Sequence, residues 1–170
     1  MGLTIKIIKN VLNKQTHQKL LTTVESSNVC WFKGEPVKNT KDIQFNHSIY
    51  AEHNVRSDLY NDFIPLYKKL GIELFHTIRL NCNIRQHTNR IFGDYHIDSY
   101  DTNNNPIKNL MVAIYYLNTT DGKTLIKENN GIKEIECVAN SVVIFSNTLQ
   151  HTGTTQTDKE LRYVLNLNYM

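Results

Sequence analysis

The sequence predicts a single α+β domain, mostly β, whose strands form an antiparallel sandwich or barrel. Two stretches with helical spacing come first, at about 13–26 and between 57 and 70. Short apolar runs separated by turn signals fill the rest of the chain, as is typical of antiparallel strands. Asn130-Gly131, which lies between two such runs, is a strong hairpin signal.

Composition narrows the class of protein. The chain has 170 residues, of which 40% are hydrophobic and 21% charged, an ordinary balance for a globular domain. The net charge of +3 is mildly basic and does not predict a nucleic-acid partner. No apolar run has the length of a membrane span, and the first residues lack a signal-peptide core. With three widely spaced cysteines, we expect a reduced, cytoplasmic protein without membrane contact, and its oligomeric state is left open.

The N-terminal part is expected to support the sheet. Thr4–Val11 is predicted to be a short strand, and Asn13 is a suitable N-cap for the helix that follows it. Residues 27–47 contain glycine and proline and are expected to be irregular. The second helix ends where Gly71 can adopt the left-handed conformation of a helix stop.

A long strand is predicted from Ile72 to Arg85, where apolar and polar residues alternate. One face carries Ile72, Leu74, His76, Ile78, Leu80, Cys82 and Ile84. The other face carries Glu73, Phe75, Thr77, Arg79, Asn81, Asn83 and Arg85. On a free-standing sheet the polar face would meet water. Because two helices precede the strand and need an apolar face to cover, we favour a polar face that lines a cavity. Further strands are expected at 109–118, at 124–126 and 132–138 on either side of the Asn130-Gly131 turn, and at 142–146 and 161–169.

The stretch His96-Ile97-Asp98 is the first candidate site. On a strand, the side chains of His96 and Asp98 point the same way, because they alternate with period two. With seven histidines in the chain, an accidental H-x-D has odds of about one in three, so the tripeptide alone is a weak motif. His151 follows a later strand and could join it. Two histidines and one carboxylate on one face of a metal form the ligand set of non-haem Fe(II) oxygenases. The other histidines are expected to have no metal role: His17, His47, His53, His76 and His87.

Arg162, at the start of the last strand, is the candidate partner for a co-substrate. A 2-oxoacid can chelate iron through its keto group and adjacent carboxylate, which leaves a second carboxylate to be held. Arginine binds a carboxylate with two parallel hydrogen bonds, which lysine cannot do. The alternative is a structural ion pair between Arg162 and Asp158 or Glu160.

In these pieces the chain resembles the 2-oxoglutarate/Fe(II)-dependent oxygenases, and among them the prolyl 4-hydroxylase-like branch with its small stand-alone bacterial and phage members. The matching pieces are His96-Ile97-Asp98, Ala113–Asn118, Asp121-Gly122, Thr124-Leu125, Ala139–Phe145, His151–Thr154 and Arg162–Tyr169. The resemblance implies a double-stranded β-helix, a jelly-roll or cupin-like fold, with N-terminal helices packed on one sheet. Residues 72–170 would form the core of a single domain, 1–170, and residues 1–71 would support it.

The resemblance also implies roles for individual residues. The implied iron ligands are His96, Asp98 and His151. Arg162 would bind the distal carboxylate of 2-oxoglutarate. Asn83 stands where members often have a tyrosine that helps to hold 2-oxoglutarate, so its amide could replace that hydroxyl. Asn166, on the same face as Arg162, is a further candidate for cofactor binding. The implied cofactors are Fe(II), 2-oxoglutarate as co-substrate and O2, with ascorbate as a supporting reductant.

The implied activity is a hydroxylation that uses 2-oxoglutarate and O2 and releases succinate and CO2. A prolyl or other side chain of a peptide or protein is the expected substrate. Three alternatives remain open. The first is an oxygenase that acts on a sugar or other small molecule. The second is a nucleic-acid demethylase, although that branch has a second arginine where this chain has Asn168. The third is a non-catalytic β-sandwich for binding or interaction, with a degenerate or structural metal site.

Overall fold

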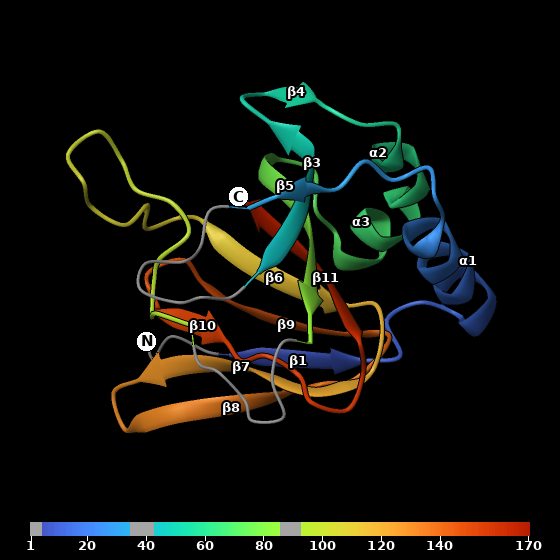
Figure 1. Ribbon diagram of the computed structural model, residues 1–170. Coiled ribbons are helices and arrows are strands. Elements are labelled where there is room, and N and C mark those ends of the chain that lie inside the picture. The colour runs from blue at the N-terminus through green and yellow to red at the C-terminus, as the bar shows by residue number, and fades with distance from the viewer. Residues whose placement is uncertain (1–4, 35–42, 86–92) are drawn as a thin grey trace.

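Two antiparallel sheets and a group of helices make up the computed structural model, which describes residues 5–34, 43–85 and 93–170 (Figure 1). The helices are α1 (Lys14–Glu25), α2 (Leu59–Asp62) and α3 (Ile64–Leu70). The strands are β1 (Lys6–Lys9), β2 (Phe32–Lys33), β3 (Gln44–Ala51), β4 (Asn54–Val55), β5 (Phe75–Ile84), β6 (Met111–Tyr116), β7 (Thr120–Glu128), β8 (Gly131–Cys137), β9 (Ser141–Ser146), β10 (His151–Gly153) and β11 (Leu161–Tyr169). No helix in these ranges is long and apolar enough to cross a membrane.

The larger sheet has the strand order β1-β9-β6-β11-β5-β3-β2, with β4 beside β3, and the smaller sheet has the order β10-β7-β8. Helices cover one face of the larger sheet (Figure 1). Alternation along β6 shows the layering: Tyr115 belongs to the core on the helix side, and Ile114 and Tyr116 belong to the core that also includes Ile126 of the smaller sheet. The fold is therefore the mostly β double-stranded β-helix that was predicted, with helices packed on one sheet.

Helix α1 is fixed at its start and along its buried side. The Asn13 side chain accepts a hydrogen bond from the backbone N–H of Thr16 at 2.9 Å, which confirms the predicted N-cap. His17, expected in a polar segment, is instead buried, with its Nδ1 2.6 Å from the hydroxyl of Tyr115. That hydroxyl donates to Oδ1 of Asn140 at 3.0 Å, so His17 is the donor to Tyr115. The three side chains tie the helix to the larger sheet.

The second predicted helix is divided in two. Helices α2 and α3 are separated by Phe63, and Pro65 lies in the first turn of α3, where its missing N–H leaves no hydrogen bond unmade. Gly71 ends α3 with a φ of 68°, as the predicted helix stop requires.

Two predictions about the strands were wrong. Residues 27–47 were expected to be irregular, but they contain β2 and the start of β3, which pairs with β5. In β5 itself, Asn168 pairs with Thr77 but Tyr169 pairs with Phe75, so β5 has one extra residue at this point. Such a bulge reverses the alternation. Phe75 is therefore buried, and Leu74, predicted to be buried, is 62% exposed.

Candidate metal centre

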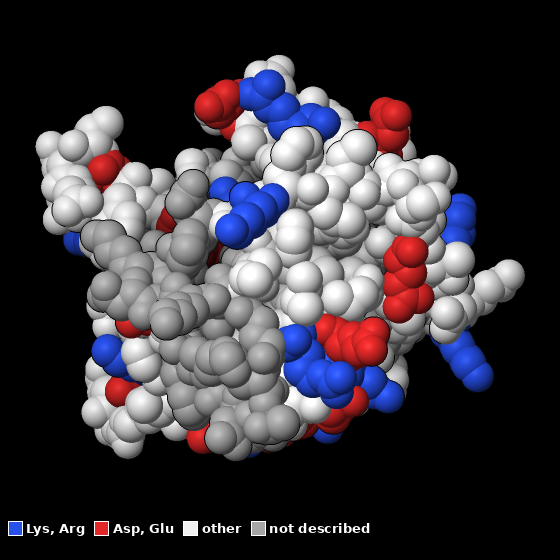
Figure 2. Space-filling model, viewed as in Figure 1, with Lys and Arg blue, Asp and Glu red and all other residues white. Residues whose placement is uncertain are grey.

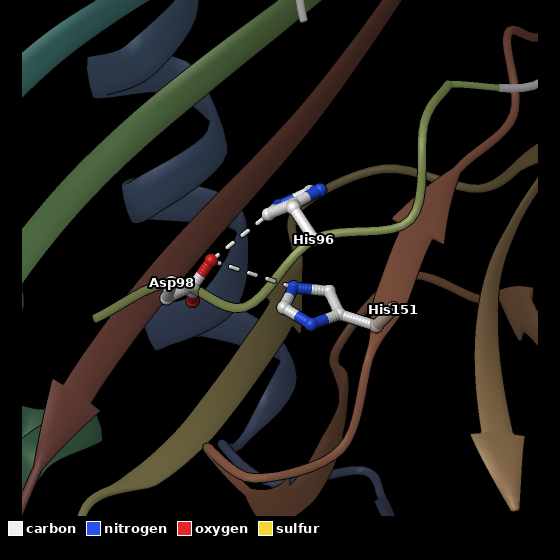
Figure 3. Close-up of side chains that lie close together, drawn as sticks. All are labelled: His96, Asp98 and His151. Carbon is white, nitrogen blue, oxygen red and sulfur yellow. Dashed lines mark ion pairs between the residues drawn. The ribbon is translucent and has the colours of Figure 1, made fainter. Parts of the chain in front are cut away.

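The backbone brings His96 and His151 together. The N–H of each donates to the carbonyl of the other at 3.0 Å, as a single antiparallel bridge. Directly opposed residues of an antiparallel pair project their side chains to the same face. Asp98 lies two residues after His96 and points the same way. Figure 3 shows the three side chains converging from these two segments.

All three side chains present a ligand atom to one point. Nε2 of His96 and Nε2 of His151 each lie 3.5 Å from Oδ1 of Asp98 (Figure 3). One ligand atom from each residue falls within 4.8 Å of the others, and no other His, Cys, Asp or Glu cluster of this kind occurs in the described part of the chain. The side chain of Asp98 is 10% exposed, that of His151 5% and that of His96 40%. The predicted trio is thus assembled, with its open side at His96.

The hydrogen bonding of His96 defines which nitrogen faces the trio. Nδ1 lies 3.1 Å from the carbonyl oxygen of Asp94. A carbonyl only accepts, so Nδ1 carries a proton; Nε2 then donates to Asp98 when the ring is protonated and turns its lone pair toward Asp98 when the ring is neutral. Two acceptors at this separation need a proton or a cation between them. This is the arrangement of metal-binding histidines, whose outer nitrogen donates to the protein.

The pKa shifts agree with a metal-binding donor set. The hydrogen bond with Asp98 raises the pKa of His96 above its ordinary value of 6.5, although burial lowers it. Burial lowers the pKa of His151. Burial alone would raise the pKa of Asp98, but the hydrogen bond from His96, the charge of His151 and the hydrogen bond from Asn166 bring it well below its ordinary range. An ionised carboxylate beside imidazole nitrogens suits a divalent metal such as iron.

Asn166, on β11, contacts Asp98. Its Nδ2 donates to Oδ2 of Asp98 at 3.1 Å. The sequence placed Asn166 on the cavity face and led us to predict that it binds 2-oxoglutarate. The structure gives it a neighbour that the period-two rule could not identify, and its role toward 2-oxoglutarate remains a prediction.

Arg162 lies on the same strand, in the same cavity. It is 3% exposed, its Nη2 is 3.5 Å from Oγ1 of Thr124, and its guanidinium carbon is 5.9 Å from the centre of the Tyr116 ring. Among the described residues it has no ion pair, so the alternative pairing with Asp158 or Glu160 is absent. A buried guanidinium without a counter-ion is costly. The environment is therefore suited to an incoming anion.

Two glycines leave room for this arginine. A Cβ on Gly122 would lie 3.1 Å from Cδ of Arg162 and 3.2 Å from the carbonyl oxygen of Thr154. A Cβ on Gly153 would lie 3.5 Å from Nη1 of Arg162, which is an ordinary contact. Gly122, which is part of the Asp121-Gly122 piece of the resemblance, thus has a steric reason to be glycine: a side chain there would displace the arginine.

A cavity of about 580 Å³ joins the trio to Arg162. Its wall includes Thr77, Arg79, Asn81 and Asn83, the polar face of β5. The cavity interpretation of that face is therefore confirmed, and the free-standing sheet is excluded. Asn83 pairs in register with Arg162. Its Oδ1 is buried and has no hydrogen-bond partner in the described ranges, so the amide is available to a ligand.

The remaining histidines that the structure describes lie outside this cavity. His47, for example, places Nδ1 2.8 Å from the carbonyl oxygen of Cys30. His87 lies outside the described residues. A larger hollow of about 1290 Å³ lies along α1 and α2, and His96, Asp98 and His151 are not among its lining residues. The trio therefore lines the smaller of these two cavities and not the larger one.

Comparisons with known proteins show which solved structures share this fold. No model of a known protein family and no curated protein sequence matches the chain. Among solved structures, a prolyl hydroxylase from Trichoplax adhaerens, in complex with a peptide fragment of the hypoxia inducible factor oxygen degradation domain, is 15% identical. The match covers 98% of this chain and 83% of that one, with a TM-score of 0.72.

Two further structures carry ligands of interest. The viral collagen prolyl hydroxylase vCPH of Paramecium Bursaria Chlorella virus-1, in its 2OG complex, is 10% identical over 98% of this chain and 96% of that one, with a TM-score of 0.62. The epimerase SnoN, in complex with Fe3+, alpha ketoglutarate and nogalamycin RO, is 9% identical over 98% and 78%, with a TM-score of 0.67. The chain has the double-stranded β-helix fold of the 2-oxoglutarate/Fe(II)-dependent oxygenases, as its prolyl hydroxylase-like neighbours indicate.

Proposed function

We propose that the protein is an Fe(II)- and 2-oxoglutarate-dependent oxygenase that hydroxylates a prolyl or other side chain of a peptide or protein. One observation carries the proposal: a His-Asp-His trio and a buried arginine without a described counter-ion open into the same cavity. The trio suits a divalent metal, and the arginine suits the far carboxylate of a dicarboxylic co-substrate.

In this proposal the metal is held by His96, Asp98 and His151. When bound, Fe(II) and 2-oxoglutarate supply the oxidative chemistry, in which O2 and 2-oxoglutarate yield succinate, CO2 and one oxygen atom for the substrate. The chain's own part is to hold Nε2 of each histidine and Oδ1 of Asp98 toward one point. The proton on Nδ1 of His96 stays with the carbonyl of Asp94, which keeps Nε2 free as a ligand.

Arg162 and its neighbours would position the co-substrate. The guanidinium lies at the end of the cavity that is formed by β11, β7 and β10, beside Thr124 and Gly153. Its fork of donors would bind the distal carboxylate, and the hydroxyl of Thr124 is near enough to share it. Asn83, across the β5–β11 pair, would contribute its amide in place of a tyrosine hydroxyl. A carboxylate held at this point would aim the other end of 2-oxoglutarate at the trio.

The peptide substrate is supported by the neighbour that binds a peptide and rests on analogy, since a fold does not fix a substrate. A small-molecule substrate is the second candidate, and the cavity lining supports it. Amide and hydroxyl side chains dominate that lining, and its described part contains no Phe, Tyr or Trp. The neighbour that holds nogalamycin RO is an example of the same fold with a small-molecule ligand.

Two other candidates receive less support. For a nucleic-acid demethylase, the place of the second arginine is taken by Asn168, whose Nδ2 donates to Oγ1 of Thr77 at 3.1 Å. On the face drawn in Figure 2, the described Lys and Arg side chains alternate with Asp and Glu and form no continuous basic stripe, which nucleic-acid binding would favour. A non-catalytic module gives no reason for a buried arginine beside an open trio.

The proposal is tested by measuring succinate formed from 2-oxoglutarate with Fe(II), O2, ascorbate and a peptide library. We expect turnover in the wild type and its loss in His96→Ala. Turnover that is indifferent to this substitution would contradict the iron assignment. His53→Ala, a change of an exposed histidine outside the cavity, is the matched control.

Binding can be followed without turnover. Fe(II) and 2-oxoglutarate, added without oxygen, should give a metal-to-ligand absorption band. If that band forms in Arg162→Ala at unchanged 2-oxoglutarate affinity, Arg162 is not the carboxylate partner.

A further inference from the structure

We propose that Arg79 binds a carboxylate of the substrate. The substrate would then be an anionic small molecule, or a peptide with an acidic side chain, that also carries hydrogen-bond donors. The inference rests on the proposed function because it concerns the same cavity. It concerns a second arginine, which is separate from the one that would hold 2-oxoglutarate.

Arg79 lies next to the trio, one strand away from the residue that contacts Asp98. In β5 it pairs with Asn166 of β11 on one side and with Ser48 of β3 on the other. Opposite residues of neighbouring strands carry their side chains on the same face, about 5 Å apart. Asn166 is the residue that donates to Asp98. A group held by Arg79 would therefore lie close to the proposed metal.

Arg79 is available to a ligand. It is exposed, yet it lines the cavity. Within the described ranges no carboxylate forms an ion pair with it and no side chain accepts a hydrogen bond from it. An arginine on an outer surface needs no such partner, because water serves it. On a cavity wall that also carries His96, Asp98 and His151, a guanidinium with no described partner is suited to recognise an anionic group.

The charges of the cavity favour a single negative charge on the ligand. Arg79 and Arg162 are positive and Asp98 is the one acidic residue in the described lining. Fe(II) and the dianion of 2-oxoglutarate would balance each other. The arginines then exceed Asp98 by one positive charge, and the unmatched cation is Arg79, because Arg162 would serve the co-substrate. One carboxylate neutralises this excess, whereas the dianion of a phosphate monoester exceeds it.

The rest of the wall offers acceptors. Asp98 can only accept, so Asn166 must turn Nδ2 toward it, and its Oδ1 is then left as an acceptor. This oxygen, like Oδ1 of Asn168, is buried and has no partner among the described residues. Asn46 and Asn81 pair across β3 and β5 and line the same cavity. Amides of this kind suit a ligand that brings N–H or O–H groups together with its carboxylate.

Two sources can supply this chemistry: a free amino acid, or an acidic residue within a peptide. The first arm of the test uses the L-amino acids and their carboxamides. The second arm uses N-acetylated, C-amidated peptides whose single carboxylate is Asp or Glu, each paired with its Asn or Gln counterpart. Binding is measured without oxygen, as the perturbation of the absorption band of the protein loaded with Fe(II) and 2-oxoglutarate.

We expect the wild type to bind the carboxylate member of at least one pair about tenfold or more tightly than its amide. Arg79→Gln should bring that ratio close to one, and Arg79→Lys should restore part of it. Arg56→Gln, a change of an arginine that pairs with Glu52 outside this cavity, should keep the wild-type ratio. The ratio is the diagnostic quantity, since a general loss of packing would weaken both members of a pair alike.

Several results would overturn the inference. These are a carboxylate preference that survives in Arg79→Gln, a protein that forms the band but binds no carboxylate probe from either arm, or tighter binding of a phosphoserine peptide than of its Asp or Glu counterpart. A wild type that forms no band at all contradicts the proposed function and the inference with it. The absorption band thus distinguishes a failure of the Arg79 inference alone from a failure of the proposed function.

Discussion

Asn166 donates a hydrogen bond to Oδ2 of Asp98 at 3.1 Å, while Nε2 of His96 and Nε2 of His151 both face Oδ1. The two oxygens of one carboxylate are thus divided between a strand of the larger sheet and the histidine pair. Such a contact holds a ligand in one orientation, and its loss costs metal affinity without removing a ligand.

Asn166→Ala should therefore lower the affinity for Fe(II) about 10- to 100-fold. Asn168→Ala is the matched control, because Asn168 lies two residues along the same strand and donates to Thr77 instead. Metal affinity can be measured by competition with a chelator. Equal affinities in the two variants would contradict the orienting role. A fall in 2-oxoglutarate affinity alone, at saturating Fe(II), would instead favour the cofactor role predicted from the sequence.

Gly122→Ala should weaken 2-oxoglutarate binding about tenfold or more, because its Cβ would press on Cδ of Arg162 at 3.1 Å and move the guanidinium from its place. Gly153→Ala should have a much smaller effect, since its Cβ meets Nη1 at 3.5 Å. Titration of the absorption band with 2-oxoglutarate measures both. The same loss in the two variants, or none in Gly122→Ala, would mean that the position of Arg162 does not limit binding.

Arg162→Met should abolish 2-oxoglutarate binding without lowering the free energy of unfolding of the metal-free protein. The reason is that a buried cation with no described ion pair costs stability in the absence of its ligand, and an apolar chain of similar length removes that cost. Denaturant unfolding with and without 2-oxoglutarate tests both halves: the ligand should stabilise the wild type and leave Arg162→Met unchanged. A strongly destabilised variant would show that the arginine is structural.

Tyr115→Phe should lower the free energy of unfolding by about 1–3 kcal/mol, because it leaves the buried Nδ1 of His17 without an acceptor. Tyr100→Phe serves as control, since Tyr100 is 47% exposed and its change should cost little. Urea unfolding of the two variants measures the difference. Equal stability would mean that water replaces the lost hydroxyl and that the contact between α1 and β6 depends on packing alone.

The two histidines of the trio should titrate apart in the metal-free protein. The pKa of His96 is raised and that of His151 is lowered from 6.5. His96 therefore keeps its proton above pH 6.5, and His151 stays neutral below it. Metal must displace the proton of His96, so affinity should fall as the pH drops through the raised pKa. NMR titration of the imidazoles measures both values. Coincident titration at the ordinary value would contradict the hydrogen bond between His96 and Asp98.

The sequence predicted those features that depend on neighbouring residues alone, such as helix caps and strand alternation. The N-cap at Asn13 and the stop at Gly71 each follow from a preference of that residue type, and the polar face of β5 follows from period two. The trio was found because His96 and Asp98 are two residues apart and His151 follows a later strand, and the resemblance implied the ligand role of all three.

Other features depend on contacts between distant segments. The bulge near the start of β5 is defined by its pairing with Asn168 and Tyr169. No residue type within β5 predicts it from the sequence. Strand β3 was missed because its cavity-facing residues, such as Gln44 and Asn46, are polar and leave a weak alternation. His17 has polar neighbours in sequence, and only its position opposite Tyr115 buries it.

The bridge between His96 and His151 has a consequence for the cohesion of the domain. His151 begins a strand of the smaller sheet, and Asp98 is bonded to β11 of the larger one. A metal held by both would act as a cross-link between the two layers. Loading should then slow the separation of the two sheets, so that the unfolding rate of the loaded protein in denaturant, compared with that of the metal-free protein, measures how strongly the metal joins them.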